Sequence, residues 1–171
     1  EWIDEYCPSG FFVFSRPGPD RLISSWFIAG EKDCPIFAKL LSRHISFFRE
    51  NKFNNEGKTN RKILKRLNNL LNRSDKTTRF WFSPVVTKLI RVYPYFLFHY
   101  LFERLVAKDR ECRKIWQEMK KVSADGPHKI QILGIFSPLN DEIKAEIDNK
   151  RTPLYKLTWK YDHSKYSSAS I

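Results

Sequence analysis

Two lysines and a threonine near the end of the chain stand at alternating positions. Lys156, Thr158 and Lys160 lie within 153–161, an aromatic and apolar segment that predicts a strand. Because side chains alternate across a strand, these three would share one face. Two ammonium groups and a hydroxyl on one face could bind the oxygens of a diphosphate. The alternative is an edge strand whose lysines prevent pairing with another chain.

A second group of polar residues surrounds a Gly-Pro pair. Asp125 and His128 are three residues apart in 123–128, where the Asp-Gly-Pro sequence predicts a turn. Such a turn could direct both side chains toward one point. The alternative is an aspartate that satisfies its own turn, beside a histidine at the edge of a loop.

The first predicted strand, 10–16, is followed by a turn predicted at 17–20. Five polar or aromatic residues lie at the end of this turn and directly after it. They are Asp20, Arg21, Ser24, Ser25 and Trp26. In α/β sheets ligands bind in the crevice outside the strand ends, where these side chains could contact a ligand. The alternatives are a surface ion pair between Asp20 and Arg21, worth less than about 1 kcal/mol, and a core position for Trp26.

His99 lies inside the most apolar stretch of the chain, 95–106, which follows Pro94. This stretch is too short, and with Glu103 and Arg104 too polar, to cross a bilayer, so it predicts a buried helix. A core histidine is therefore favoured over a histidine that contacts a ligand.

Strands and helices alternate along the rest of the chain. An amphipathic helix is predicted over 33–50, with Pro35 in its first turn, and Asp109 predicts the cap of another helix. A brief alternation over 129–133 predicts a strand, and Ser137-Pro138 predicts the start of a last helix. Segment 21–29 is compatible with either a strand or a helix. The alternation favours the α/β class.

The composition points to one folded domain with an anionic partner. The chain has 171 residues, 42% of them apolar, which excludes disorder, and we expect a single domain with a flexible tail at 163–171. Its formal net charge of +12 suits nucleic acid, acidic lipid or a phosphorylated small molecule. Three scattered cysteines favour a reducing compartment. No nucleophile triad, phosphate loop, dinucleotide fingerprint or zinc spacing is present, so phosphoryl transfer and dehydrogenase chemistry are unsupported.

Segment 51–91 carries nine of the twelve net positive charges, from eleven Lys and Arg residues and two acids. A predicted basic helix within it has an apolar stripe made of Ile63, Leu64, Leu67, Leu70 and Leu71. Such a helix could place 58–91 on an anionic membrane surface, or its stripe could pack on the body of the protein. Nucleic acid is disfavoured, because the charge is confined to one insertion and the aromatic residues lie in apolar runs.

Four stretches occur in the order found in one known family. They are FFVFSRPGPDRLISSWF at 11–27, YPYFLFHYLF at 93–102, SADGPH at 123–128 and LYKLTWK at 154–160. Together they resemble the capsular polysaccharide synthesis proteins, relatives of the glycosyltransferases that carry an Asp-X-Asp sugar-nucleotide motif. The resemblance covers nearly the whole chain, apart from the basic insertion and the tail.

This resemblance implies a GT-A-like fold and an enzyme that transfers a sugar from a nucleotide-sugar donor to a growing surface glycan. It implies a divalent metal, Mn or Mg, and a peripheral place at the cytoplasmic face of the cell membrane. It also implies that the metal-binding acids lie upstream, so we expect residues 1–171 to be the C-terminal portion of such a transferase.

The resemblance assigns roles to the candidate residues. Lys156, Thr158 and Lys160 would bind the donor diphosphate, while Asp125 and His128 would complete the metal shell. Trp26 would stack on a sugar ring. The other residues expected to contact the sugar or the acceptor are Asp20, Arg21, Ser24, Ser25 and His99.

Overall fold

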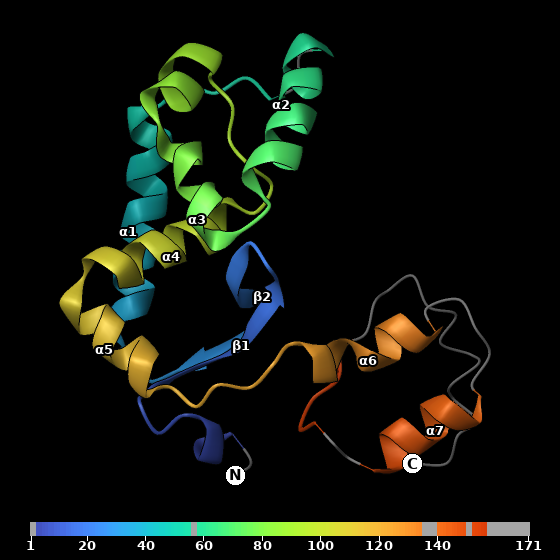
Figure 1. The fold of residues 1–171 in the computed structure, drawn as a ribbon. Coiled ribbons are helices and arrows are strands. Elements are labelled where there is room, and N and C mark those ends of the chain that lie inside the picture. Colours follow the sequence, from blue (N-terminus) through green and yellow to red (C-terminus); the bar gives the residue numbers. More distant parts are fainter. Residues whose placement is uncertain (1–2, 56–57, 135–139, 150–151, 157–171) are drawn as a thin grey trace. The chain divides into compact units, whose positions relative to one another are not determined.

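A computed structural model describes residues 3–55, 58–134, 140–149 and 152–156 (Figure 1). The chain divides into two compact units, residues 3–122 and the part from residue 123 onward. The fold is mixed α/β and mostly helical, with one two-stranded antiparallel sheet in the described part. The first unit contains η1 (Asp4–Tyr6), β1 (Phe11–Gly18), β2 (Arg21–Gly30), α1 (Pro35–Glu50), α2 (Lys58–Leu71), α3 (Asp75–Thr78), η2 (Arg79–Phe82), η3 (Val85–Ile90), α4 (Leu97–Lys108) and α5 (Arg110–Glu118). The second unit contains α6 (Asp125–Gly134) and α7 (Asp141–Asp148).

The strands β1 and β2 form a hairpin, with Gly18 opposite Arg21 beside the turn. Segment 21–29, for which the sequence left two possibilities, is therefore a strand. Since the hairpin is antiparallel, the crevice of an open parallel sheet does not describe the surroundings of Asp20. Asp20 instead lies in the hairpin turn.

The turn predicted at 17–20 is shorter in the structure, because Pro17 and Gly18 belong to β1. A proline within a strand is tolerated where its missing N–H would face an open edge. No third strand pairs with the hairpin in the described ranges, although the N–H of Ser15, two residues before Pro17, donates to the carbonyl oxygen of Val122 at 2.8 Å. Register irregularities on both sides of Ser15 also relax the ladder near Pro17.

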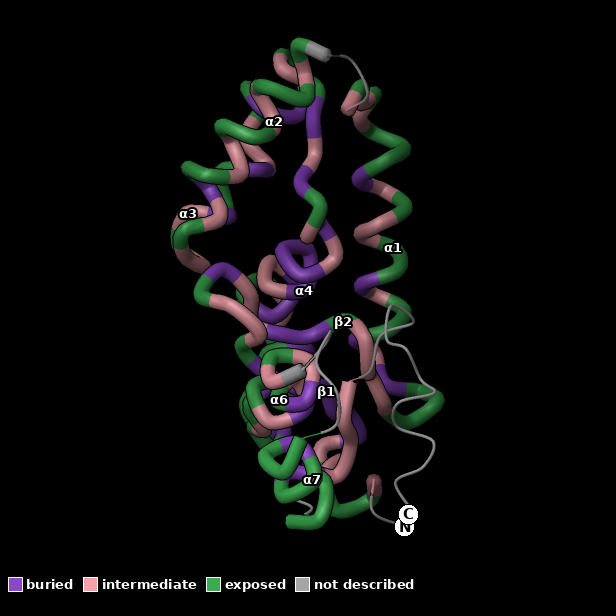
Figure 2. Tube along the Cα trace, turned by 90° about the vertical axis from the view of Figure 1, so that its right-hand side faces the viewer, coloured by how far each residue is buried: buried purple, intermediate pink, exposed green. Residues whose placement is uncertain are grey.

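The main core lies between the hairpin, α1, α4 and α5. Phe11 and Val13 of β1, Ile36 and Leu40 of α1 and Phe102 of α4 all belong to it, and all five are buried. Figure 2 shows buried positions along the strands and α4. In α1 the apolar residues recur at three- and four-residue intervals, the spacing of a helix with one core-facing side. The helices predicted at 33–50 and 95–106 are confirmed.

Asp109 marks the start of α5, as predicted. Its carboxylate accepts a hydrogen bond from the backbone N–H of Cys112 at 3.0 Å and two from Lys39 of α1 at 2.9 and 3.1 Å. The Cys112 N–H and then the Lys39 ammonium group lower the pKa of Asp109 to about 2. The cap therefore also ties α5 to α1.

Most of the apolar stripe of α2 packs on the body of the first unit, while Leu70 is exposed. Leu71 is buried in a second core with Trp81 and Tyr100, and Leu64 and Leu67 pack against it. This contact favours the packing alternative for the stripe, and its binding to anionic lipid stays a prediction. In the part of the chain that the structure describes, no helix is both long and apolar enough to cross a membrane.

The second unit differs from the prediction at α6. Residues 123–128 were expected to form a turn and 129–133 a strand, but a helix begins at Asp125 and continues to Gly134. Pro127 is compatible with this helix, because N–H groups of the first turn have no intrahelical acceptor. The alternation over 129–133 was too short to separate a strand from one side of a helix.

The strand predicted over 153–161 is not present in its described part, since residues 153–156 are irregular. Residues 157–161 lie outside the described residues. The helix start predicted at Ser137-Pro138 also falls outside them, and α7 begins later, at Asp141. Its cap is Asn140, whose Oδ1 accepts a hydrogen bond from the N–H of Ile143 at 2.9 Å.

Replacing the cap of α7, Asn140→Ala, should destabilise this helix by about 1 kcal/mol, because the N–H of Ile143 loses its acceptor. Hydrogen exchange of the amides in 141–148, measured on the full chain, should become faster by several-fold. Asn140→Asp keeps an acceptor and serves as the control. Equal exchange in the two variants would show that the helix does not depend on this cap.

Candidate functional site

Five residues from the hairpin turn, the start of β2 and α4 form a polar cluster at the edge of the core. They are Asp20, Arg21, His99, Tyr100 and Glu103, here named the Asp20 cluster. Asp20 is only 4% exposed. Its carboxylate accepts hydrogen bonds from the Tyr100 hydroxyl at 2.5 Å and from Arg21 Nε at 3.1 Å. Because hydrogen bonds to an ionised carboxylate are strong, this residue joins the hairpin turn to the middle of α4.

The Arg21 guanidinium group is held from two sides. Its Nε donates to Asp20, and its Cζ lies 3.7 Å from the centroid of the Phe96 ring. The Arg21 side chain is 19% exposed. It is therefore a positioned cation that keeps some contact with solvent, and its planar set of donors suits a phosphate or carboxylate group.

Glu103 lies one turn beyond His99 on α4. Burial is the main cause that raises the pKa of its carboxyl group to about 7. The Thr78 hydroxyl, which donates a hydrogen bond at 3.1 Å, acts to lower the pKa, and the charges of Asp75 and Asp20 act to raise it. A carboxyl group with a pKa near neutrality can accept a proton and release it again at neutral pH. Strong perturbation of this kind is frequent at functional sites.

His99 is a neutral imidazole. Burial lowers its pKa to about 4, and the positive charge of Arg21 acts in the same direction. A hydrogen bond to the backbone of Phe96 acts against this lowering. By strict hydrogen-bond geometry, Nδ1 of His99 and Oγ of Ser24 on β2 are buried without a partner among the described residues.

In the second unit, the candidate Lys156 lies near the start of α6, the helix that carries the candidates Asp125 and His128. The backbone N–H of Lys156 donates to the carbonyl oxygen of Pro127 at 2.9 Å, which places Lys156 beside the start of α6. His128 follows Pro127, and its Nδ1 lies 2.7 Å from the carbonyl oxygen of Ala124. Thr158 and Lys160 lie outside the described residues.

The family comparison covers the whole chain. The family model described as capsular polysaccharide synthesis protein matches residues 1–171. This chain belongs to that family. Its members take part in capsular polysaccharide synthesis, and the resemblance drawn from the four sequence stretches is confirmed. No curated protein and no solved structure matches the chain at a significant level.

In this capsular polysaccharide synthesis protein, three residues selected from sequence come together. Asp20, Arg21 and His99 all belong to the Asp20 cluster, and burial of Asp20 excludes a simple surface pair with Arg21. Ser25 is exposed on β2. The Trp26 ring stacks on Phe14, with centroids 5.2 Å apart and planes 9° apart, so one face of the indole is covered by protein.

Two members of the cluster, Tyr100 and Glu103, were missed by sequence reasoning. His99 and Glu103 are four residues apart in an apolar helix, so they share one side of it. That spacing was a usable signal for a polar site. Tyr100 gave none, because a tyrosine in an apolar run is equally typical of a core.

The metal implied by the family resemblance needs more ligands than the candidates provide. Asp125 and His128 are three residues apart on α6 and therefore lie on one side of that helix. Within the described ranges, no group of three or more His, Cys, Asp or Glu side chains is arranged to hold a metal ion. Two side chains alone do not form the octahedral shell of a Mg or Mn ion, so no step below is routed through a metal.

Proposed function

We propose that this protein is a glycosyltransferase, or its C-terminal part, that moves a sugar from a nucleotide-sugar donor onto a growing capsular polysaccharide. The observation that carries the proposal is the match of the capsular polysaccharide synthesis family to the complete chain. A GT-A-like architecture, a divalent metal and a peripheral place at the cytoplasmic face of the membrane belong to the same proposal.

The Asp20 cluster supplies groups that sugar transfer requires. When the bond between the anomeric carbon and the donor diphosphate breaks, its electron pair goes to a phosphate oxygen, where negative charge develops. Lys156, in the second unit, is the described lysine proposed to bind the diphosphate, and Arg21, in the first unit, is a fixed cation proposed to contact the sugar or the acceptor. Positive groups that are already in place stabilise such charge without reorganisation.

The acceptor side of the reaction needs a base. As the acceptor oxygen bonds to the anomeric carbon, its hydroxyl proton must leave. Glu103 is the described carboxylate best suited to take it, because its pKa of about 7 leaves an ionised fraction at neutral pH and keeps the proton affinity high. His99 and Ser24 have buried polar atoms that can bind sugar hydroxyl groups.

The full protein, incubated with a panel of nucleotide sugars, Mn or Mg and capsular acceptor, should transfer one sugar or slowly hydrolyse its donor. In the Lys156→Ala variant we expect the donor dissociation constant to rise about tenfold, because one ammonium contact to the diphosphate is lost. Donor binding is measured by isothermal titration calorimetry.

Lys144→Ala is the matched control, since Lys144 is exposed on α7 and pairs only weakly with Asp141, at 3.6 Å. This variant should bind the donor like the parent. If the parent neither transfers sugar nor hydrolyses any donor, the transferase proposal is wrong. If Lys156→Ala binds as tightly as the parent, the diphosphate role of Lys156 is wrong.

A further inference from the structure

Helix α1 has an apolar side that the protein leaves exposed. Phe37, Leu41, Ile45 and Phe48, here named the α1 apolar face, are 38%, 62%, 47% and 43% exposed. Their spacing of four, four and three residues places them on one side of the helix. The buried residues of α1 are Ile36, Leu40 and Phe47, and exposed positions run along the helix away from α4 (Figure 2). The rings of Phe37 and Phe48 also contact Phe11 and Tyr93, with centroids 5.8 and 5.1 Å apart, so Leu41 and Ile45 are the most exposed part of the face. Contiguous exposed apolar residues of this size mark an interaction surface.

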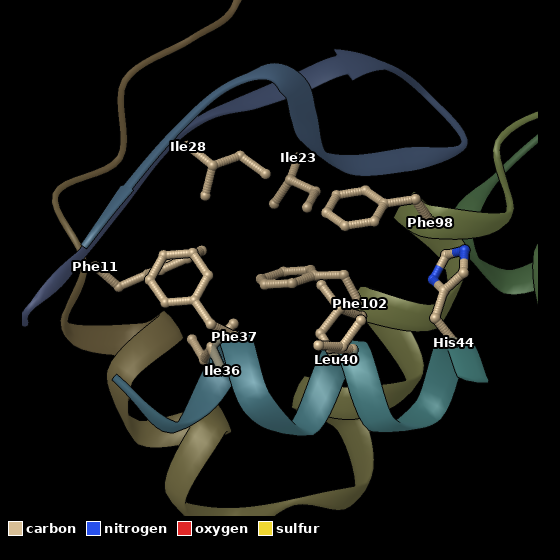
Figure 3. Close-up of a pocket in the computed structure, with 10 residues that line it drawn as sticks. Phe11, Ile23, Ile28, Ile36, Phe37, Leu40, His44, Phe98 and Phe102 are labelled. Carbon is tan, nitrogen blue, oxygen red and sulfur yellow. The ribbon is translucent and has the colours of Figure 1, made fainter. Parts of the chain in front are cut away.

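This face borders a hollow of about 310 Å³ in the first unit. Phe37 and Leu41 both line the hollow and belong to the α1 apolar face, so the hollow is open on that side. Figure 3 shows it between the hairpin, α1 and α4, with the rings of Phe11, Phe98 and Phe102 turned toward it. Its volume is at the lower end of the range for ligand pockets, about 300–1,000 Å³.

The lining of the hollow favours a hydrocarbon group as its ligand. All lining side chains are apolar except that of His44, and burial lowers the pKa of this imidazole, which keeps it neutral. A polar or charged ligand would lose its hydration here without gaining hydrogen bonds. An alkyl or isoprenyl chain has no polar groups whose hydration would be lost, and its binding would remove apolar surface from water.

Positive charge collects where the α1 apolar face ends. Arg49 follows Phe48, and Lys52 lies three residues further on. Lys88 and Arg91 are drawn to the same place, because Lys88 Nζ donates to the carbonyl oxygen of Glu50 and Arg91 Nε donates to that of Lys52 at 2.8 Å.

These four cations, Arg49, Lys52, Lys88 and Arg91, are all exposed. None of them forms an ion pair within the described part of the chain. Their charges are therefore available to an external anion, although Lys88 and Arg91 also donate to backbone carbonyl oxygens, and they lie at the end of the α1 apolar face.

We propose that the α1 apolar face and the hollow bind the hydrocarbon chain of an anionic lipid, whose phosphate group is bound by the four cations at the end of α1. An apolar surface followed by a cationic one matches a molecule with an apolar tail and an anionic head. The stripe of α2 offers less apolar surface, since Leu64, Leu67 and Leu71 pack in the second core and Leu70 is its exposed member. The lipid site extends beyond the proposed transfer reaction and does not depend on it.

Vesicle binding tests the α1 apolar face. The full chain is floated with vesicles of phosphatidylcholine, with or without phosphatidylglycerol. The parent should bind the anionic vesicles, and Leu41→Glu should lower the partition coefficient about tenfold by placing a carboxylate in the apolar layer. Leu70→Glu is the matched control, because Leu70 is exposed to a similar extent, 54%, on α2.

Three results of the vesicle experiment would contradict the lipid proposal. Equal binding by Leu41→Glu and the parent would overturn the lipid proposal. Loss of binding in Leu70→Glu alone would identify α2 as the membrane surface instead. A dimer that Leu41→Glu dissociates, without any vesicle binding by the parent, would identify a second copy as the occupant of the face.

Calorimetry with dodecyl phosphate, below its micelle concentration, tests the hollow and the cations together. The parent should bind dodecyl phosphate more tightly than dodecanol and should not bind inorganic phosphate measurably. Arg49→Ala should weaken dodecyl phosphate binding several-fold and leave dodecanol binding unchanged. Ile28→Trp, which fills the hollow, should weaken the binding of both. Binding of dodecyl phosphate that neither variant changes would overturn the assignment, as would equally tight binding of inorganic phosphate.

Discussion

Replacing Asp20 by alanine should lower the free energy of unfolding of the first unit by about 3 kcal/mol. The substitution leaves Arg21 without its carboxylate partner and the Tyr100 hydroxyl without its acceptor, in a region where Asp20 is 4% exposed. Removing one partner of a buried ion pair costs about 3–5 kcal/mol. The lower value applies, because Arg21 is partly exposed and water can solvate its guanidinium group.

The loss is best measured by urea unfolding of the full chain, read through hydrogen exchange of amides in β2 and α4. Since the chain has two units, an exchange signal assigned to these elements reports on the first unit alone. Tyr100→Phe is the control that removes only one hydrogen bond to Asp20 and should cost about 1.5 kcal/mol. If Asp20→Ala costs no more than Tyr100→Phe, the Arg21 contact does not stabilise the fold.

The elements that sequence predicted correctly are those whose local signals agree with their packing. In α1 the helical spacing of Ile36 and Leu40 coincides with the side that contacts the core, and Asp109 both caps α5 and binds Lys39. The start of α6 was missed because Asp-Gly-Pro is compatible with a turn and with the first turn of a helix. Only the surrounding fold decides between these two conformations.

The sequence predicted which residues of the hairpin turn belong to the candidate site, but it did not predict their burial or the pKa of Glu103. Asp20 and Arg21 are recognisable in the sequence as charged residues beside a strand, but the buried carboxylate of Asp20 depends on Tyr100, which is 80 residues further along the chain. The raised pKa of Glu103 likewise has burial as its main cause. Such properties arise from contacts between distant segments, and a local pattern of residue types does not contain them.

Replacing Glu103 by glutamine should lower the rate of sugar transfer by about 10²–10⁴-fold, the usual contribution of a positioned general base. The amide oxygen can still accept the hydrogen bond from Thr78, so the fold around α4 should be retained. In the parent, the rate should rise with pH as the carboxyl group ionises near pH 7. The residual activity of Glu103→Gln should lack this rise, while donor binding remains as in the parent.

The same substitution should also change how the stability of the first unit depends on pH. The pKa of Glu103 is raised in the folded state from 4.5 to about 7, so its contribution is fully present below pH 4.5 and is lost as the pH rises toward 7. His99 acts in the opposite direction. Its pKa is lowered from 6.5 to about 4, so its contribution is present above pH 6.5 and is lost as the pH falls toward 4.

Between pH 4.5 and 6.5, Glu103 and His99 change the free energy of unfolding of the parent with pH in opposite directions. In Glu103→Gln only the change due to His99 should remain. The stability of the variant relative to the parent should therefore rise between pH 4.5 and 7. The complete shift corresponds to about 3 kcal/mol, and we expect about half of this, because the half-buried carboxyl group is partly screened by water. Urea unfolding at several pH values, read through amides of α4, measures the difference. A constant difference from pH 4.5 to 7 would mean that Glu103 titrates as it does in the unfolded chain, and the general-base role would then lose its physical basis.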